Sequence, residues 1–286
     1  MANELTYYKK SESYSKGIAL SSTDKRKKKR LDITKMLVWG IMIFNVFFVG
    51  IVIASLFLKS SVSSVLDVIQ SINTINAVRI TISSIACSAV LTMVIGIPFA
   101  YLMAQKQGKI YRIMNMIVNL PLVMPPTVGG LALLIAFGRR GAFGGIINFL
   151  GFDIPFSFIA LIIVQVFVML PLFTQSLRNG FEAIEKDVIE AARIFGSGEK
   201  QLLFFFYLPL SVRSFMTGLI MACLRAAGEF GATMMFAGNL TGKTQTLSTA
   251  IYTLSQKDLG QSISLALVLL LIFLIPLLVL ELKLKD

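Results

Sequence analysis

Six apolar runs constrain the fold of this 286-residue chain more than any other feature. A helix needs about 20 apolar residues to cross a bilayer. Segments close to that length are Met36–Leu58, Ile80–Tyr101, Ile117–Phe137, Phe158–Leu177, Phe215–Phe236 and Ile263–Leu280. Backbone groups find no partners in lipid, so a spanning segment is a helix or part of a closed barrel. No segment alternates as a barrel strand does, and the sequence therefore predicts an all-α polytopic membrane protein with six transmembrane helices.

Composition supports this fold class and argues against metal, haem and catalytic sites. Hydrophobic residues make up 56% of the chain and charged residues 15%, against about 25% charged residues in ordinary soluble domains. Histidine is absent, and the two cysteines, Cys87 and Cys223, lie inside apolar runs, where small packing side chains are expected. The usual ligands of zinc and haem are therefore missing. We expect no metal, no cofactor and no catalytic residues.

The distribution of positive charge predicts the orientation in the membrane. With the N-terminus in the cytoplasm, 20 of the 27 lysines and arginines lie on the cytoplasmic side, which follows the positive-inside rule. Both termini are then cytoplasmic. The basic run Lys25–Arg30 directly precedes the first span, so contact with anionic lipid explains it and nucleic-acid binding is not needed.

The same pattern predicts the domain organisation. Residues 1–35 form a polar, basic cytoplasmic tail that we expect to be disordered. Its junction with the first span does not resemble a signal peptide, because the apolar run is too long and no clean cleavage site follows. Residues 36–286 form the transmembrane domain, which carries one long cytoplasmic loop, residues 178–213.

This loop has the pattern of an amphipathic helix that ends at a glycine. Apolar side chains recur every three or four positions and predict one continuous stripe: Phe181, Ile184, Val188, Ala192 and Phe195. Glu182 precedes Lys186 by four residues, a favourable helical spacing for an ion pair. Gly196 and Gly198 end the predicted helix, and Glu199–Tyr207 starts a second short helix before Pro209. An interfacial helix would carry basic flanks, whereas this segment is rich in glutamate, which favours docking on a soluble partner.

The loop resembles the EAA loop of ABC importer membrane subunits. Its residues Glu190, Ala191, Ala192 and Gly196, followed by Leu208-Pro209, have the family spacing, and Phe206 replaces the usual isoleucine. The resemblance implies a type I importer bundle and a coupling helix formed by those residues. It also implies two cytoplasmic ATP-binding subunits, a second copy of the chain and an extracytoplasmic substrate-binding protein.

A second group of segments is similar to molybdate permeases. It comprises Gly228–Thr233, Met235–Asn239, Thr244–Leu247, Pro121–Thr127 and Gly138–Gly141. Sulfate and tungstate permeases share the first of these in looser form. The resemblance implies transport of an oxyanion, most simply molybdate, into the cytoplasm, with tungstate or sulfate/thiosulfate as alternatives. A secondary anion transporter is an alternative of another class, with only Arg225 and Glu229 as titrating groups in the membrane.

Two features inside the spans suggest a pathway or gate. Arg225 and Glu229 are four apart in the fifth predicted span, so one helical face carries both. They face protein or a water-filled cavity, since a charge in lipid is costly. They either fasten helices together or separate two states by breaking their ion pair. Pro121, Pro125, Pro126 and Gly129-Gly130 interrupt the third predicted span, which makes it either a pathway wall or flexing element, or a static kink.

An oxyanion is recognised by hydroxyl, amide and backbone N–H groups. The residues of this kind near the outer half of the bundle are Thr127, Thr233, Asn239, Thr244 and Gln245. Arg139 and Arg140, in an outer loop, either attract anions or anchor the chain at the interface. The chain has no G-x-x-x-x-G-K-[ST] motif, so ATP hydrolysis is expected on a partner.

Overall fold

The computed structural model describes residues 34–106 and 108–283, and in these ranges all regular secondary structure is helical. Four helices have the length and hydropathy to span a membrane: Thr34–Lys59, Ile72–Gln105, Phe158–Glu182 and Leu259–Leu278. Two bent helix pairs raise the number to six when each pair is taken as one span. The predicted fold class is confirmed. The predicted tail lies outside the described residues up to position 33.

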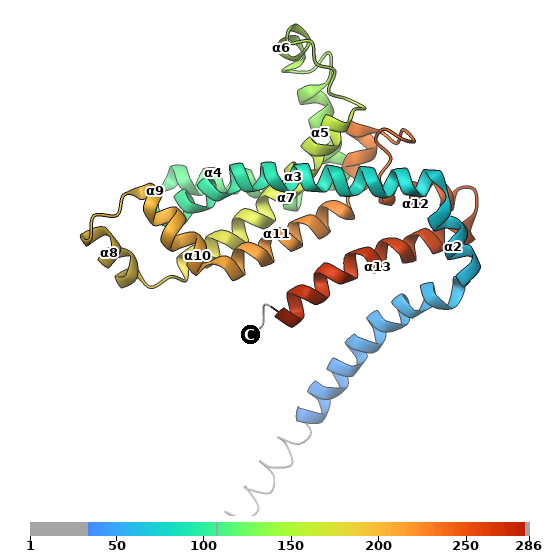
Figure 1. The fold of residues 1–286 in the computed structure, drawn as a ribbon, viewed down its shortest axis with the longest axis horizontal. Helices are drawn as coiled ribbons and strands as arrows, with labels where there is room; N and C mark the ends of the chain where they lie inside the picture. Colours follow the sequence, from blue (N-terminus) through green and yellow to red (C-terminus); the bar gives the residue numbers. More distant parts are fainter. Residues whose placement is uncertain (1–33, 107, 284–286) are drawn as a thin grey trace, which may run out of the picture. The chain divides into compact units, whose positions relative to one another are not determined.

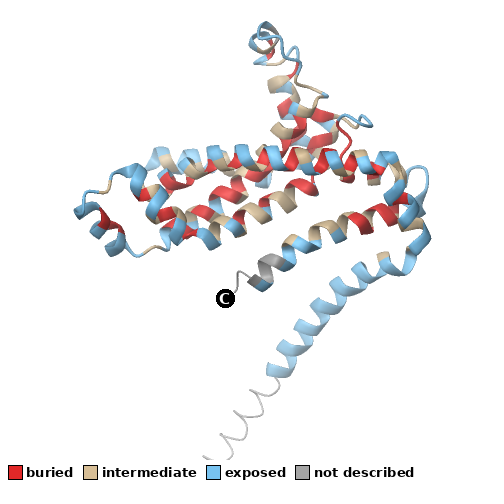
Figure 2. Cartoon of the chain, in the orientation of Figure 1, coloured by how far each residue is buried: buried red, intermediate tan, exposed pale blue. Residues whose placement is uncertain are grey.

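The chain divides into two compact units at Leu58. The first contains the helix Thr34–Lys59, whose most apolar 18-residue window is 0% buried. Its residues are exposed except for Leu56, which is intermediate, and Figure 2 shows this helix almost entirely in pale blue. A helix that is hydrophobic on every side belongs in lipid or against other helices.

Three helices form the centre of the second unit. They are α3 (Ile72–Gln105), α7 (Phe158–Glu182) and α11 (Val212–Ala227), and α7 packs on both of the others. Figure 1 shows them side by side with α4. Small residues bring them close: an added Cβ at Gly180 of α7 would lie 2.4 Å from the Ser214 Cβ of α11. Without a hydrophobic force between helices in lipid, such close contact is what holds a bundle together.

A buried amide joins α3 and α7 inside this bundle. Gln165 is 2% exposed, and its Oε1 accepts a hydrogen bond from Ser88 at 2.9 Å. Its Nε2 donates to Ser84 at 2.9 Å. Both ends of the amide therefore have partners on the facing helix, so its burial is compensated.

Three further helices pack together at one end of the bundle. Helices α2 (Val62–Gln70) and α12 (Leu247–Ser255) contact α13 (Leu259–Lys283). The Thr81 hydroxyl of α3 accepts a hydrogen bond from the backbone N–H of Leu247 at 2.9 Å, at the first turn of α12. That contact satisfies one of the free donors of the helix N-terminus.

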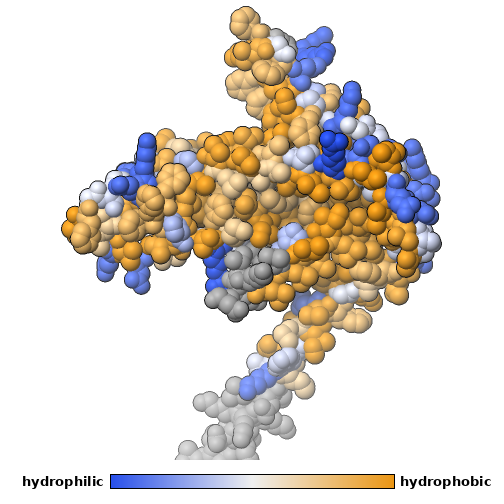
Figure 3. Space-filling view, in the orientation of Figure 1, coloured by the Kyte–Doolittle hydropathy of each residue, from blue (hydrophilic) through white to orange (hydrophobic). Residues whose placement is uncertain are grey.

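Hydrophilic residues lie at the two ends of the second unit. Figure 3 shows apolar side chains along the length of α3 and hydrophilic ones toward α8 (Lys186–Ile194) and toward α2 and α12. This distribution places the bundle across a membrane with its polar ends in the two aqueous phases.

The third predicted span is not one straight helix. It consists of α4 (Lys109–Val123) and α5 (Pro126–Phe137), which are bent by 119° at the break between them. Pro125 has an extended backbone (φ −54°, ψ 136°). Pro126 is the first residue of α5, a position where the backbone N–H that proline lacks would have no partner within the helix. Beyond α5, the short helix α6 (Gly144–Phe149) follows a turn.

The fifth predicted span is also interrupted. Helix α11 ends at Ala227, residues 228–230 form a break, and the π-type segment η2 (Thr233–Ala237) follows. At the other end, α11 meets the Glu199–Leu210 segment at a bend of 76°. The other four predicted spans are each part of one observed helix, which extends several residues further in most cases.

The close approach of α7 and α11 generates a stability prediction. Gly180→Ala places a methyl group against Ser214, and overpacking of this kind costs about 1–3 kcal/mol. We expect a lower melting temperature in detergent, measured by circular dichroism. Ser214→Gly should restore stability in the Gly180→Ala background.

The matched control is Gly145→Ala, because a Cβ at Gly145 in α6 meets nothing within 4 Å. That change should leave the melting temperature equal or slightly higher, since alanine favours the helix. Equal melting temperatures for Gly180→Ala and the wild type would show that the two helices are not held at the observed distance.

Candidate functional site

The loop after α7 forms two helical segments, as the sequence predicts, but the first of them begins later than predicted and is separated from α7. Helix α7 ends at Glu182, residues 183–185 are irregular, and α8 covers Lys186–Ile194. The predicted continuous stripe is therefore wrong. Ile184 packs into the same core cluster as Phe181 and Ile189, so the chain turns back onto the bundle. Glu182 pairs with Arg178 at 2.6 Å, not with Lys186 as the spacing suggested.

Helix α8 has one face on the bundle and one face exposed. Ile189 and Ala192 are buried, at 6% and 5% exposure, whereas Glu190 and Ala191 are exposed. Large apolar side chains also remain outside the bundle: Ile194 is 84% exposed and Phe195 is 89% exposed. Exposed apolar side chains beside charged ones are typical of a surface that another protein covers.

Gly196 closes α8 in the way the sequence predicts. Its φ is 85°, which favours glycine. The N–H of Gly196 donates to the Arg193 carbonyl at 2.9 Å, and the N–H of Ser197 donates to the Ala192 carbonyl at 3.1 Å. These two bonds make a Schellman motif, which satisfies carbonyls at the end of the helix. An added Cβ would meet nothing within 4 Å, so the backbone, not crowding, requires glycine here.

The second segment returns the chain to the bundle. It contains α9 (Glu199–Gln201), the π-type segment η1 (Leu202–Tyr207) and α10 (Leu208–Leu210). Leu202 and Tyr207 are buried, and Leu208 packs against the same core. Pro209 lies in the first turn of α10, where its missing donor is tolerated.

A polar network that the sequence did not suggest ties this loop to α3. The Tyr101 hydroxyl donates to Glu199 Oε2 at 2.6 Å, and Glu199 Oε1 lies 3.5 Å from Arg193 Nη2. Arg193 also donates to Gln105 Oε1 at 3.2 Å. Tyr101, Phe181 and Tyr207 pack edge to face, with centroid distances of 5.1–6.3 Å. Since Tyr101 and Glu199 are 98 residues apart, no local pattern predicts their contact.

Arg225 and Glu229 form the predicted ion pair but not on one helical face. Arg225 Nη1 lies 2.6 Å from Glu229 Oε2, and the side chains are 38% and 1% exposed. Glu229 lies in the break after α11, where its Oε1 accepts a hydrogen bond from the Ala232 N–H at 3.0 Å. One carboxylate thus neutralises an arginine and caps the helical turn that leads into η2.

The breaks of the third and fifth spans lie against each other. An added Cβ at Gly231 would lie 2.9 Å from the Pro126 Cβ, and one at Gly130 would lie 2.7 Å from the Ala232 Cα. Pro125, Pro126 and Thr127 are exposed at the start of α5, next to this contact. The structure therefore brings the proline break and the ion pair into one region.

The other predicted polar residues are distributed differently. Thr233 is 1% exposed in η2, and Thr244 and Gln245 are 0% and 5% exposed. Asn239 donates to Thr253 Oγ1 at 2.7 Å, and Gln245 donates to the same oxygen at 3.4 Å. The Oδ1 atom of Asn239 is buried without a partner among the described residues. Of the five predicted anion contacts, Thr127 alone is exposed in this protomer.

The predicted outer arginines lie in the turn after α5. Arg139 Nε donates to Asp153 Oδ1 at 3.1 Å. The hydrogen bond from Arg139 lowers the pKa of the Asp153 carboxyl below its ordinary value. Arg140 is exposed in the same turn. Arg139 is thus engaged within the loop.

Among the described residues, no group of three His, Cys, Asp or Glu side chains could hold a metal ion. Both cysteines are free thiols, with Cys87 exposed and Cys223 partly buried. The predicted site residues thus lie mainly in two places, the loop that carries α8 at one end of the bundle and the ion pair at two helix breaks.

Comparison with known proteins identifies relatives across most of the chain. Residues 96–282 match the family model described as "Binding-protein-dependent transport system inner membrane component". The probable transport system permease protein NifC of Clostridium pasteurianum is 32% identical over 235 residues, covering 82% of each chain. The molybdenum transport system permease protein ModB of Mycobacterium tuberculosis is 36% identical over 193 residues, covering 68% of this chain and 73% of the relative.

The fold matches a solved structure as well. A bacterial ABC transporter involved in the import of the acidic polysaccharide alginate superposes with a TM-score of 0.67 at 17% identity. The match covers 88% of this chain and 96% of that chain. At this identity the likeness establishes the fold of an ABC transporter membrane subunit and nothing about the cargo.

The ion pair generates a prediction about stability. Arg225→Ala leaves the buried Glu229 carboxylate without its counter-charge, and breaking a buried pair costs about 3 kcal/mol or more. Glu229→Gln removes the charge but keeps an oxygen for the Ala232 N–H, so it should cost less. The melting temperatures of Arg225→Ala and Glu229→Gln, measured in detergent, test this difference.

The double variant Arg225→Ala with Glu229→Gln serves as the control. It should be more stable than Arg225→Ala alone, since no charge is then left buried and unpaired. If Arg225→Ala were as stable as the wild type, the pair would not hold the helix break together.

Proposed function

This chain belongs to the family of binding-protein-dependent transport system inner membrane components, the permeases of ABC importers, and we propose that it imports molybdate into the cytoplasm. The observation that carries the importer mechanism is the geometry of α8, which ends at Gly196 with two exposed apolar side chains. The fold and the family make the chain a multi-pass membrane protein of the cytoplasmic membrane.

The relatives' names support molybdate as the cargo. Molybdenum transport system permeases of several bacteria are 32–36% identical to this chain over 177–193 residues. The segments Gly228–Thr233 and Met235–Asn239, which resemble molybdate permeases, form the break after α11 and η2. Tungstate and sulfate remain alternatives within the family. With the family established, the secondary anion transporter is no longer a competing class.

The proposed coupling residues are Glu190, Ala191, Ala192, Gly196, Leu208 and Pro209. Their arrangement supports docking on an ATP-binding subunit, because Glu190 and Ala191 are exposed on α8 while Ala192 holds the helix on the bundle. Ile194 and Phe195 add an apolar contact at the helix end. We place this loop and both termini in the cytoplasm, as the positive charges favour.

The complete transporter would contain two copies of the chain, two ATP-binding subunits and an extracytoplasmic binding protein. The apolar surfaces of the helix Thr34–Lys59 and of α4 support contact with lipid and a second copy. None of the described residues of α4 is buried within the protomer. We propose that ATP hydrolysis takes place on the partner subunits.

The pathway or gate residues that we propose are Arg225, Glu229, Pro125, Pro126, Thr127, Thr233 and Asn239. They divide into two roles. Thr127 is exposed at the N-terminus of α5, where free backbone N–H groups and the helix dipole favour an anion. Thr233 and Asn239 are packed inside the protomer, so they support the shape of the break.

Transport requires two states with different affinities for ATP. ATP binding on the partners favours one arrangement of the two α8 helices, and that arrangement opens the pathway outward. Hydrolysis removes this preference and returns the pathway inward. A ligand that binds both arrangements equally would shift nothing.

Gly196 provides the test of coupling. Gly196→Val forces a β-branched residue to φ 85°, a conformation that costs L-residues roughly 1–2 kcal/mol. We expect loss of co-purification of the ATP-binding subunit, or loss of ATP-driven uptake. The matched control is Gly242→Val, because Gly242 has φ 77° and equally open surroundings but lies in another loop. Normal uptake by Gly196→Val would remove α8 from the coupling role.

Competition between anions tests the cargo. In proteoliposomes containing the complete transporter, uptake of labelled molybdate should fall when excess tungstate is added, because the two oxyanions have the same charge and shape. Excess sulfate should have little effect. Equal inhibition by sulfate would assign the chain to the sulfate branch and leave the importer mechanism unchanged.

A further inference from the structure

A basic pocket lies away from the proposed pathway, where the end of α3, the start of α4 and the end of α7 meet. The cavity has a volume of about 360 Å³, and its polar lining is made by Lys106, Tyr111, Arg112, Asn115, Arg178 and Glu182. It opens at the same end of the bundle as the loop that carries α8.

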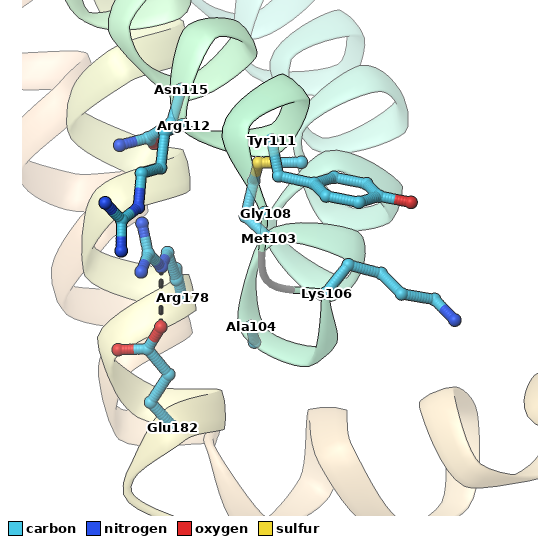
Figure 4. A pocket seen from close by; sticks show the side chains of 9 residues that line it. All are labelled: Met103, Ala104, Lys106, Gly108, Tyr111, Arg112, Asn115, Arg178 and Glu182. Carbon is cyan, nitrogen blue, oxygen red and sulfur yellow. Dashed lines mark hydrogen bonds and ion pairs between the residues drawn. The ribbon is translucent and has the colours of Figure 1, made fainter.

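Two guanidinium groups face each other in this pocket. Figure 4 shows Arg112 of α4 and Arg178 of α7 pointing toward one another, with Asn115 beside them and Lys106 and Tyr111 on the opposite wall. Arg178 uses its Nε for the 2.6 Å pair with Glu182, and no described residue pairs with its two terminal nitrogens. The Arg112 side chain has no carboxylate partner in the described ranges. Lys106 also lines the pocket, but Figure 4 shows its side chain directed away from the two guanidinium groups, so two cations lie near one carboxylate.

Like charges at short range repel, so this arrangement is stable when an anion lies between them. A phosphate group fits the donors. Guanidinium groups bind phosphate oxygens through pairs of parallel hydrogen bonds, and the Asn115 amide can add another donor. The N-terminus of α4 has no side-chain cap at Gly108, which leaves backbone N–H groups at the pocket edge.

The surroundings of the pocket distinguish lipid from free phosphate. The apolar side chains Ile113, Met116 and Ile117 of α4 are 49%, 61% and 56% exposed. They continue from the pocket along the helix toward the middle of the membrane. An inorganic ion would not need this apolar surface, whereas the acyl chains of a bound lipid would cover it.

We propose that Arg112, Arg178 and Asn115 bind the phosphate of an anionic phospholipid, with the acyl chains along α4. Basic pockets between transmembrane helices on the cytoplasmic side are suited to such headgroups. The site would hold the α3–α4 turn against α7, next to the loop that docks the ATP-binding subunit. Its position in the cytoplasmic leaflet rests on the orientation in the proposed function, but the binding chemistry does not.

The test is lipid binding to the purified transporter, measured by native mass spectrometry with short-chain phosphatidylglycerol. Arg112→Gln should weaken binding roughly fivefold, the factor that one basic residue contributes near an anionic headgroup. Arg178→Gln should act in the same direction. Arg112 is the cleaner position, because its side chain is exposed and its replacement leaves no carboxylate unpaired.

The matched control is Arg213→Gln, which removes an exposed arginine at the start of α11, outside the pocket. Its phosphatidylglycerol binding should equal that of the wild type. Equal weakening in all three variants would reveal general surface attraction and overturn the site. Displacement of the lipid by inorganic phosphate, or equal binding of phosphatidylcholine, would overturn the lipid assignment. Molybdate uptake by the wild type is measured separately, so failure of the site and failure of the proposed function are distinguishable.

Discussion

A helix that breaks inside a membrane leaves backbone groups without partners, and lipid supplies none. The structure depends on how its breaks at residues 124–125 and 228–230 are satisfied. They pack against each other because Gly130 and Gly231 have no side chains to separate them. Glu229 then accepts a hydrogen bond from the Ala232 N–H and pairs with Arg225. A buried carboxylate is costly in an apolar segment, but here it compensates both a free donor and a positive charge.

The same physical limit explains which parts of the fold could be predicted. A long apolar run in a bilayer must pair its own backbone groups, which a helix does. Four predicted spans are accordingly each part of one observed helix. The breaks were harder to predict. Pro121, Pro98 and Pro171 remain inside helices, whereas Pro125 and Pro126 separate two helices bent by 119°. The difference lies in tertiary partners: Gly231 lies against Pro126 and Ala232 against Gly130, and a proline pattern contains no information about these contacts.

The loop that carries α8 shows the same division between local and non-local information. Gly196 ends α8 because a left-handed residue must close a Schellman motif, and that requirement is visible in the sequence. The prediction of one helical stripe from Phe181 to Phe195 was wrong. Ile184 packs into the bundle core, and the chain is not helical between α7 and α8. The bond between Tyr101 and Glu199 had no sequence signal, since it joins different helices through folding of the whole chain.

That bond has a mechanical consequence for an importer. Helix α3 has 34 residues, about 51 Å at 1.5 Å per residue. Its Tyr101 end is tied to the α8 loop, and Thr81 near its other end binds the first turn of α12. The Gln165 amide holds α7 to the middle of the same helix. Hydrogen bonds and one continuous helix thus connect the α8 loop with residues on the opposite side of the bundle. Coupling along this route still requires that ATP prefer one of two arrangements, and α3 is the described element long enough to connect both ends in either arrangement.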